Sequence, residues 1–134
     1  MTTQNSCATW LASSKSKTKT PKTKNPKTKR AMTNSSPAQV FAAHFLAALA
    51  KAGVRNFFLA PGARSQALAI AAGQLASAGK IDLHVRLDER SLAFTALGSA
   101  LASGEPSVII TTSGTAVANL HPAVLEANHS GVPL

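Results

Sequence analysis

The sequence predicts an α/β protein, a three-layer sandwich in which helices cover both faces of a parallel sheet. Short apolar runs of four to seven residues alternate along the chain with longer segments of helical patterning that end at Gly. Strands separated by helices pair in parallel through right-handed crossovers. A length of 134 residues is enough for one domain.

A helix is expected first. Ser36 is a good N-cap, Pro37 suits the first helical position, and Gly53 is a good stop. Four apolar residues between them have helical spacing: Val40, Phe41, Phe45 and Leu49.

Three strand–helix units follow. The predicted strands are 56–60, 81–87 and 107–111. The predicted helices are 65–78, 89–103 and a third that begins after a Ser-Gly-Thr turn and runs to about Asn128. Residues 131–134 resemble the approach to a fourth strand. Because a parallel sheet needs its inner strands paired and its faces covered, we expect the front part of a longer protein.

The strong positive charge belongs to one end of the chain. Residues 1–30 hold eight of the 14 Lys and Arg and no acid, whereas the remainder has six basic and five acidic residues. We therefore expect residues 1–35 to be a disordered basic tail or leader and residues 36–134 to be the domain. The lone Cys7 excludes an internal disulfide. No apolar stretch reaches the roughly 18 residues that span a bilayer.

Three interpretations of this tail stay open. It is a solvated or non-native leader, with Met32 as an alternative start. It is a transit peptide, which would place the protein in a plastid. Or it is an arm that binds nucleic acid or another anionic surface.

Ligands of parallel sheets bind at the carboxyl ends of the strands, and three loops are expected there. The first, 61–65, places Arg64 at a helix N-terminus, which suits a carboxylate or phosphate. The second places Glu89 at the mouth of the crevice, and the third, 112–115, contains Gly114. Each loop also has a purely structural interpretation. Arg64 would be a solvated cation, Glu89 a first-turn acid favoured by the helix dipole, and 112–115 an ordinary strand-to-helix turn. Walker A and dinucleotide fingerprints do not occur.

Taken in order, these loops resemble one family. The segments that show this resemblance are 58–65 (FLAPGARS), 87–94 (LDERSLAF), 111–120 (TTSGTAVANL) and 122–127 (PAVLEA). They are similar to the N-terminal domain of the thiamine-diphosphate-dependent 2-succinyl-5-enolpyruvyl-6-hydroxy-3-cyclohexene-1-carboxylate synthases of menaquinone or phylloquinone biosynthesis. The resemblance covers about residues 37–134 and implies a pyrimidine-binding domain.

The resemblance implies roles for single residues. Glu89 matches the catalytic glutamate, which hydrogen-bonds the N1′ atom of the aminopyrimidine and promotes loss of the thiazolium C2 proton. The residues implied to bind the cofactor are Glu89, Pro61, Ser113, Gly114 and Asn119. Arg64 and Ser65 would bind substrate, with Arg64 paired to a carboxylate.

The family also implies partners that this chain would need. The substrates are isochorismate and 2-oxoglutarate, the assembly is a dimer or tetramer, and the compartment is the cytoplasm. Magnesium or manganese and the diphosphate bind a separate domain of a second subunit, so no metal ligand is expected in this chain. We expect the 134-residue chain to be inactive alone.

Two departures and three alternatives accompany the resemblance. Ala63 stands where the family usually has Ser, and His121 where it usually has Tyr.

One alternative to this family is another thiamine-diphosphate enzyme, such as a relative of acetolactate synthase. The second is a non-catalytic α/β binding module with a basic nucleic-acid-binding arm. The third is a truncated pseudogene product without a stable fold.

Overall fold

A computed structural model describes residues 35–134, so the predicted tail at 1–35, except for Ser35, lies outside the described residues. The elements follow in the order α1 (Pro37–Lys51), β1 (Asn56–Leu59), the short 3-10 helix η1 (Ala63–Ser65), α2 (Gln66–Ser77), β2 (Asp82–Val85), α3 (Glu89–Ser103), β3 (Ser107–Ile110) and α4 (Thr115–Ser130). This order confirms the predicted α/β class.

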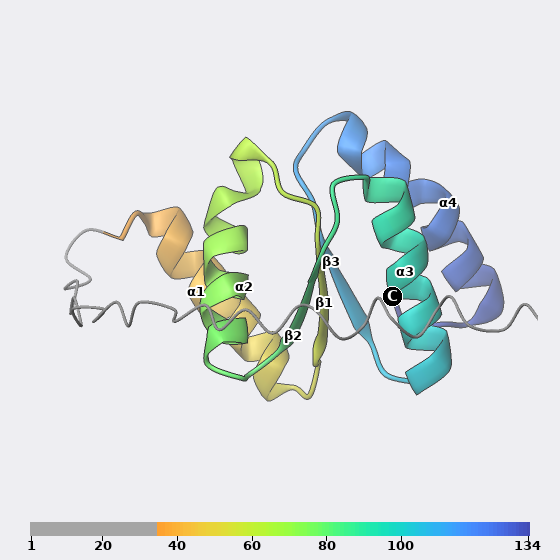
Figure 1. The fold of residues 1–134 in the computed structure, drawn as a ribbon, viewed down its shortest axis with the longest axis horizontal. Coiled ribbons are helices and arrows are strands. Elements are labelled where there is room, and N and C mark those ends of the chain that lie inside the picture. The colour runs from red at the N-terminus through yellow and green to blue at the C-terminus, as the bar shows by residue number, and fades with distance from the viewer. Residues whose placement is uncertain (1–34) are drawn as a thin grey trace, which may run out of the picture. The chain divides into compact units, whose positions relative to one another are not determined.

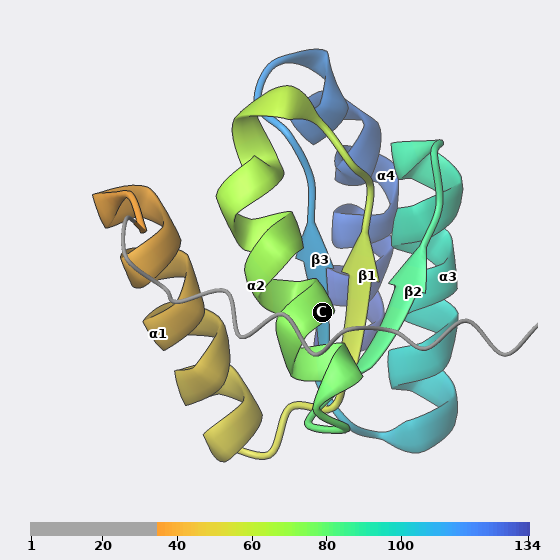
Figure 2. The same ribbon diagram turned by 60° about the vertical axis from the view of Figure 1, so that its left-hand side comes forward.

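The strands form one parallel sheet in the order β2-β1-β3, with β1 in the centre (Figure 2). Asn56 of β1 lies opposite Asp82 on one side and Ser107 on the other, so all three strands begin at the same level. Helices α1 and α2 cover one face, and α3 and α4 cover the other (Figure 1). The three layers predicted from the sequence are therefore present.

The central strand β1 divides the core into two clusters, because successive side chains of a strand point to opposite faces. Phe57 is fully buried in the cluster on the α1 and α2 side. Phe58, 2% exposed, packs with Leu92 and Ala96 of α3 on the other side. One short strand thus holds both helix layers against the sheet.

Side-chain caps explain where two helices begin. The hydroxyl of Ser36 accepts a hydrogen bond from the backbone N–H of Gln39, whose side-chain oxygen accepts from the backbone N–H of Ser36 (2.9 Å). This reciprocal capping box fixes the start of α1. Helix α3 begins after Asp88, whose carboxylate accepts from the backbone N–H of Ser91 (2.8 Å).

The face of α1 that enters the core carries Ala42 and Leu46. Ala42 and Leu46 are each 1% exposed. Phe41 and Phe45, predicted from their helical spacing, instead stack on each other on the outer side with ring centroids 5.8 Å apart. The helix is confirmed, and its largest side chains lie outside the core.

The predicted strand 81–87 is too long. β2 ends at Val85, since its partner β1 ends at Leu59, directly opposite. Leu87 is 84% exposed, so an apolar residue at this position is no sign of a buried strand. The other predicted boundaries differ from the observed ones by a residue or two, which is ordinary for helix and strand ends.

Residues 131–134 form no regular strand. The carbonyl of Pro133 nevertheless accepts a hydrogen bond from the backbone N–H of Ser107 at 3.2 Å. This segment, which the sequence predicts to be the approach to a fourth strand, therefore lies beside the first residue of β3.

Candidate functional site

Three loops leave the carboxyl edge of the sheet, where the sequence places the site. Their starting points are tied together by backbone hydrogen bonds. The N–H of Ala60 donates to Ile110 (2.9 Å), and the N–H of Arg86 donates to Leu59 (3.1 Å). The ladder thus continues past the end of the central strand on both sides, and the loops start from fixed positions.

The first and third loops touch at Gly62. A Cβ atom at this position would lie 2.4 Å from the Cβ of Thr112, a distance that no side chain can adopt. The φ of Gly62 is −156°, extended backbone that any residue reaches. Close approach therefore explains the glycine. Thr112 is not among the site residues predicted from the sequence.

Arg64 reaches from the first loop to the turn before α4. Its Nη2 atom lies 4.0 Å from the place where a Cβ on Gly114 would stand. Gly114 has φ +91°, a conformation that glycine adopts without the strain of a side chain. The exposed guanidinium group and the open turn thus lie together, as their position at neighbouring strand ends predicts.

Ser65 turns into its own loop. It is 4% exposed, and its hydroxyl donates to the backbone carbonyl of Gly62 at 3.1 Å. This bond gives the hydroxyl a role in closing the loop. Its assignment to substrate binding stays a prediction, and Pro61 and Ser113 are exposed on the flanking loops.

Glu89 is the first residue of α3 and is half-buried. Its Oε2 atom accepts a hydrogen bond from the side-chain Nδ2 of Asn119, in the second turn of α4, at 3.3 Å. Within residues 35–134, the other carboxylate oxygen, Oε1, has no hydrogen-bond donor. The structure therefore joins two of the predicted site residues and leaves one acceptor available to a ligand.

Asp88 fixes the backbone from which Glu89 projects. The backbone N–H of Ser91, with a smaller contribution from the Ser91 side chain, holds the pKa of the Asp88 carboxyl below its ordinary value. An ionised carboxylate is favoured at a helix N-terminus by the unpaired N–H groups there. The cap thus holds the first turn of α3 in place at neutral pH.

Thr111 adds a feature that the sequence does not signal. It follows the last residue of β3, and its hydroxyl oxygen is buried without a hydrogen-bond partner among the described residues. A buried hydroxyl without a partner is costly. The sequence predicts Thr111 as the end of a strand and as part of the TTSGTAVANL motif, without a role of its own.

Residues 35–134 contain no group of three or more His, Cys, Asp or Glu placed to hold a metal ion. In the same part of the chain, no helix combines the length and apolarity needed to cross a membrane.

Comparison with known proteins supports the resemblance. Residues 39–134 match the family model of the thiamine pyrophosphate enzymes, N-terminal TPP binding domain. A 2-succinyl-5-enolpyruvyl-6-hydroxy-3-cyclohexene-1-carboxylate synthase of Leifsonia xyli is 59% identical over 99 residues, or 74% of this chain. The enzyme of the same name from Clavibacter michiganensis is 54% identical over 99 residues, and that of Synechococcus is 56% identical over 86 residues.

The matched region is a small part of each relative. The chain spans 17% of the length of the Leifsonia and Clavibacter enzymes and 15% of the Synechococcus enzyme. The resemblance to the synthases predicted from the loop motifs is confirmed, and the alternative of a non-catalytic binding module finds no support among these matches.

Proposed function

The chain belongs to the family of thiamine pyrophosphate enzymes through their N-terminal TPP-binding domain, and on this premise we propose that it is the pyrimidine-binding part of a synthase of menaquinone or phylloquinone biosynthesis. The proposed reaction decarboxylates 2-oxoglutarate and adds the resulting succinic-semialdehyde unit to isochorismate. Identities of 54–59% to synthases of this name support the choice of reaction.

The observation that carries the proposal is the position of Glu89. The carboxylate lies at the carboxyl edge of the sheet, is held by Asn119 through one oxygen, and has its second oxygen available. A group in this position can share a proton with a ring nitrogen of a bound heterocycle. We assign Glu89 this role towards N1′ of the aminopyrimidine.

Other residues at the same edge fit a bound heterocycle. Gly62 and Gly114 keep side chains out of the contact between the first and third loops. Pro61 and Ser113 flank these glycines on exposed loops. When bound, thiamine diphosphate supplies the nucleophilic carbon and the electron sink, and the protein orients it.

Asn119 and Asp88 have supporting roles in this proposal. Asn119 fixes the rotamer of Glu89 by donating to Oε2. Asp88 anchors the first turn of α3 through Ser91. Neither needs to touch the reacting atoms, so each acts through the geometry of Glu89.

Arg64 is proposed to bind a substrate carboxylate. Both proposed substrates are carboxylates, and the arginine fork pairs with such groups through two parallel hydrogen bonds. The proximity of Arg64 to Gly114 would place this pair beside the third loop. Ser65 would contribute by holding the first loop closed through Gly62 or by a direct contact to substrate.

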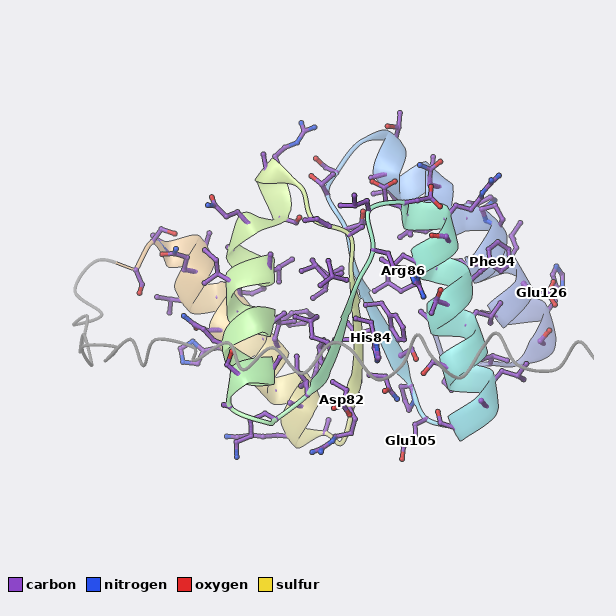
Figure 3. The ribbon with its side chains drawn as sticks, in the orientation of Figure 1. Asp82, His84, Arg86, Phe94, Glu105 and Glu126 are labelled. Carbon is purple, nitrogen blue, oxygen red and sulfur yellow. The ribbon has the colours of Figure 1, made fainter. Side chains whose placement is uncertain are left out.

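The remaining parts of the active site are proposed to come from another domain of a second subunit. Large apolar side chains on α3 and α4 are exposed, as Figure 3 shows for Phe94, and such surface is typical of subunit contacts. They are Phe94, Leu101, Val117, Val124 and Leu125. We propose that magnesium or manganese and the diphosphate bind that partner, and that the chain alone is inactive.

A chimaera tests the proposal. Residues 36–134 would replace the matching segment of the Leifsonia xyli synthase, to which the matched region is 59% identical. We expect synthase activity with 2-oxoglutarate and isochorismate. Glu89→Gln in the chimaera should lower kcat by roughly 10²–10⁴-fold, the range of general acid–base contributions, and should slow exchange of the thiazolium C2 proton with solvent.

The unmodified Leifsonia enzyme and a Glu105→Gln chimaera are the controls, since Glu105 lies before β3 at the other edge of the sheet (Figure 3). A folded chimaera without synthase activity, beside an active parent, would refute the assigned reaction. Normal C2 proton exchange in the Glu89→Gln chimaera would refute the assigned role of Glu89.

A further inference from the structure

A hollow with a basic rim lies at the edge of the sheet opposite the candidate site, where α1 and α2 end and β1 and β2 begin. Its volume is about 280 Å³. The side chains around it are of two kinds, apolar Ala47, Ala50 and Leu75 and cationic Lys51, Arg55 and Lys80. We call these six residues the basic hollow.

The positive charges of a nearly neutral domain are concentrated around the basic hollow. Residues 35–134 contain six Lys and Arg and five Asp and Glu, and three of the six cations surround this hollow. All three are exposed. Within residues 35–134, none of them forms an ion pair with a carboxylate. Three like charges around one depression repel each other unless an anion lies between them.

The helix ends beside the hollow do not need hydrogen bonds from these cations. Lysine at a helix C-terminus often stabilises the last carbonyl groups, but here the main chain already does so. After both helices the chain reverses through a glycine with positive φ, Gly53 at 99° and Gly79 at 66°. The N–H groups of Gly53, Val54, Gly79 and Lys80 donate to carbonyls of the preceding helix at 2.9–3.2 Å.

The same turns fix where the cations start. The backbone carbonyl of Arg55 accepts a hydrogen bond from the N–H of Asp82 at 2.8 Å, which ties the entry of β1 to the entry of β2. The backbone N–H of Lys80 donates to the backbone carbonyl of Leu75 at 2.9 Å. This hydrogen bond links a cationic residue of the hollow to an apolar one. The backbone of the hollow is therefore organised without a ligand.

We propose that the basic hollow binds a small organic dianion, a dicarboxylate carried on a flat apolar ring. The cations would pair with the two carboxylates, and the ring would cover Ala47, Ala50 and Leu75. Arg55 provides the fork that matches a carboxylate. An inorganic anion would satisfy the charges alone and leave the apolar surface exposed to water, so it should bind more weakly.

One acid lies near this edge. Asp82 is the first residue of β2 and is exposed (Figure 3). Its charge opposes that of the cations, so it should weaken the binding of an anion. Removal of the Asp82 charge should therefore strengthen anion binding, whereas removal of a lysine charge should weaken it.

The test is a titration of the ¹⁵N-labelled 134-residue chain with phthalate, followed by the amide signals of single residues. A signal for each residue is needed because the eight basic residues of 1–30 attract any anion. Inorganic phosphate and the uncharged phthalamide are the comparison ligands. We expect saturable shifts at Lys51, Leu75 and Lys80 with a Kd on the order of millimolar, weaker binding of phosphate, and no binding of phthalamide.

Variants then separate charge from shape. Lys51→Gln and Lys80→Gln should each raise the Kd of phthalate up to about fivefold, the range of an exposed ion pair. Arg86→Gln, the matched control at the exposed residue directly after β2, should not. Ala47→Met, which fills the hollow, should weaken phthalate and leave phosphate unchanged. Asp82→Asn should tighten both.

Three outcomes would overturn the proposal. The first is the absence of saturable shifts at the hollow in a chain with dispersed amide signals. The second is equal binding of phosphate and phthalate, which would make the hollow a counter-ion site only. The third is an unchanged Kd in the Lys51→Gln/Lys80→Gln double variant. If the chain lacks dispersed signals, the same titration of the Leifsonia chimaera decides between these results.

Discussion

Strands β1 and β2 have the same length, run side by side in register and lead to loops at the same edge, yet their surroundings differ. Phe57, Phe58 and Leu59 of β1 are at most 5% exposed, whereas Val85 of β2 is 56% exposed. The central strand has a neighbour on each side and helices on both faces. Among residues 35–134, the outer strand has one neighbour strand, and its surface is largely exposed.

This difference shows how two loops of one site are held. The loop after β1 is positioned by the sheet, through Ala60 and through the contact of Gly62 with Thr112. Glu89 follows the outer strand, so the sheet holds it less firmly. Its position depends instead on Asp88, which caps α3, and on the hydrogen bond from Asn119.

The largest expected effect is in the central strand. Phe57→Ala removes a ring that is 0% exposed and should cost about 3–5 kcal/mol in the free energy of unfolding, enough to abolish a cooperative transition in a marginally stable domain. The matched change in the outer strand, Val85→Ala, should cost less than about 0.5 kcal/mol. Urea unfolding followed by circular dichroism measures both, and equal costs would contradict the comparison.

A smaller effect is expected where the sheet holds the first loop. Gly62→Ala places a Cβ 2.4 Å from that of Thr112, so the loops must separate, at a cost of about 1–3 kcal/mol. The change should also lower kcat/KM in the Leifsonia chimaera, because Arg64 is carried by the same loop. Thr112→Gly in the Gly62→Ala background should recover stability; a failure to recover would mean that the contact does not limit the loop.

Asn119→Ala tests the support of Glu89 by the neighbouring helix. The bond is long, 3.3 Å, so its removal should cost at most about 1 kcal/mol in stability. We expect kcat of the chimaera to fall about tenfold, or about 1.4 kcal/mol in the activation free energy, since the rotamer of Glu89 is no longer fixed. Asn119→Asp, of nearly the same shape, should be worse than Asn119→Ala, because two like charges would then face each other. Equal activity of all three proteins would rule out the positioning role.

The smallest expected effect is the pH dependence that the cap of α3 confers. The pKa of Asp88 is lowered in the folded chain, so its stabilisation is complete above the ordinary carboxyl pKa and is lost as the pH falls through the lowered value. Asp88→Asn keeps a cap without a titratable group. Its urea midpoint should therefore fall less than that of the parent between pH 7 and pH 3, and an identical fall would show that Asp88 does not contribute.

The order of helices and strands could be predicted because each boundary has a local cause, such as the capping box at Ser36 or the glycine at 104 in the left-handed conformation. The convergence of three loops at one edge follows from parallel pairing. The end of β2 was misjudged because Leu87 is apolar but has no partner strand opposite it. The bond between Glu89 and Asn119 could not be predicted, since it depends on how α3 packs against α4.

The outer side of β2 has a consequence for handling the protein. In the sheet formed by residues 35–134, its second row of N–H and C=O groups faces no strand, and exposed apolar residues such as Val85 flank it. Such an edge is a template for strands of other molecules, so we expect concentrated solutions to aggregate through it. Val85→Lys should raise the solubility limit, and this makes it the first change to introduce before crystallisation or NMR.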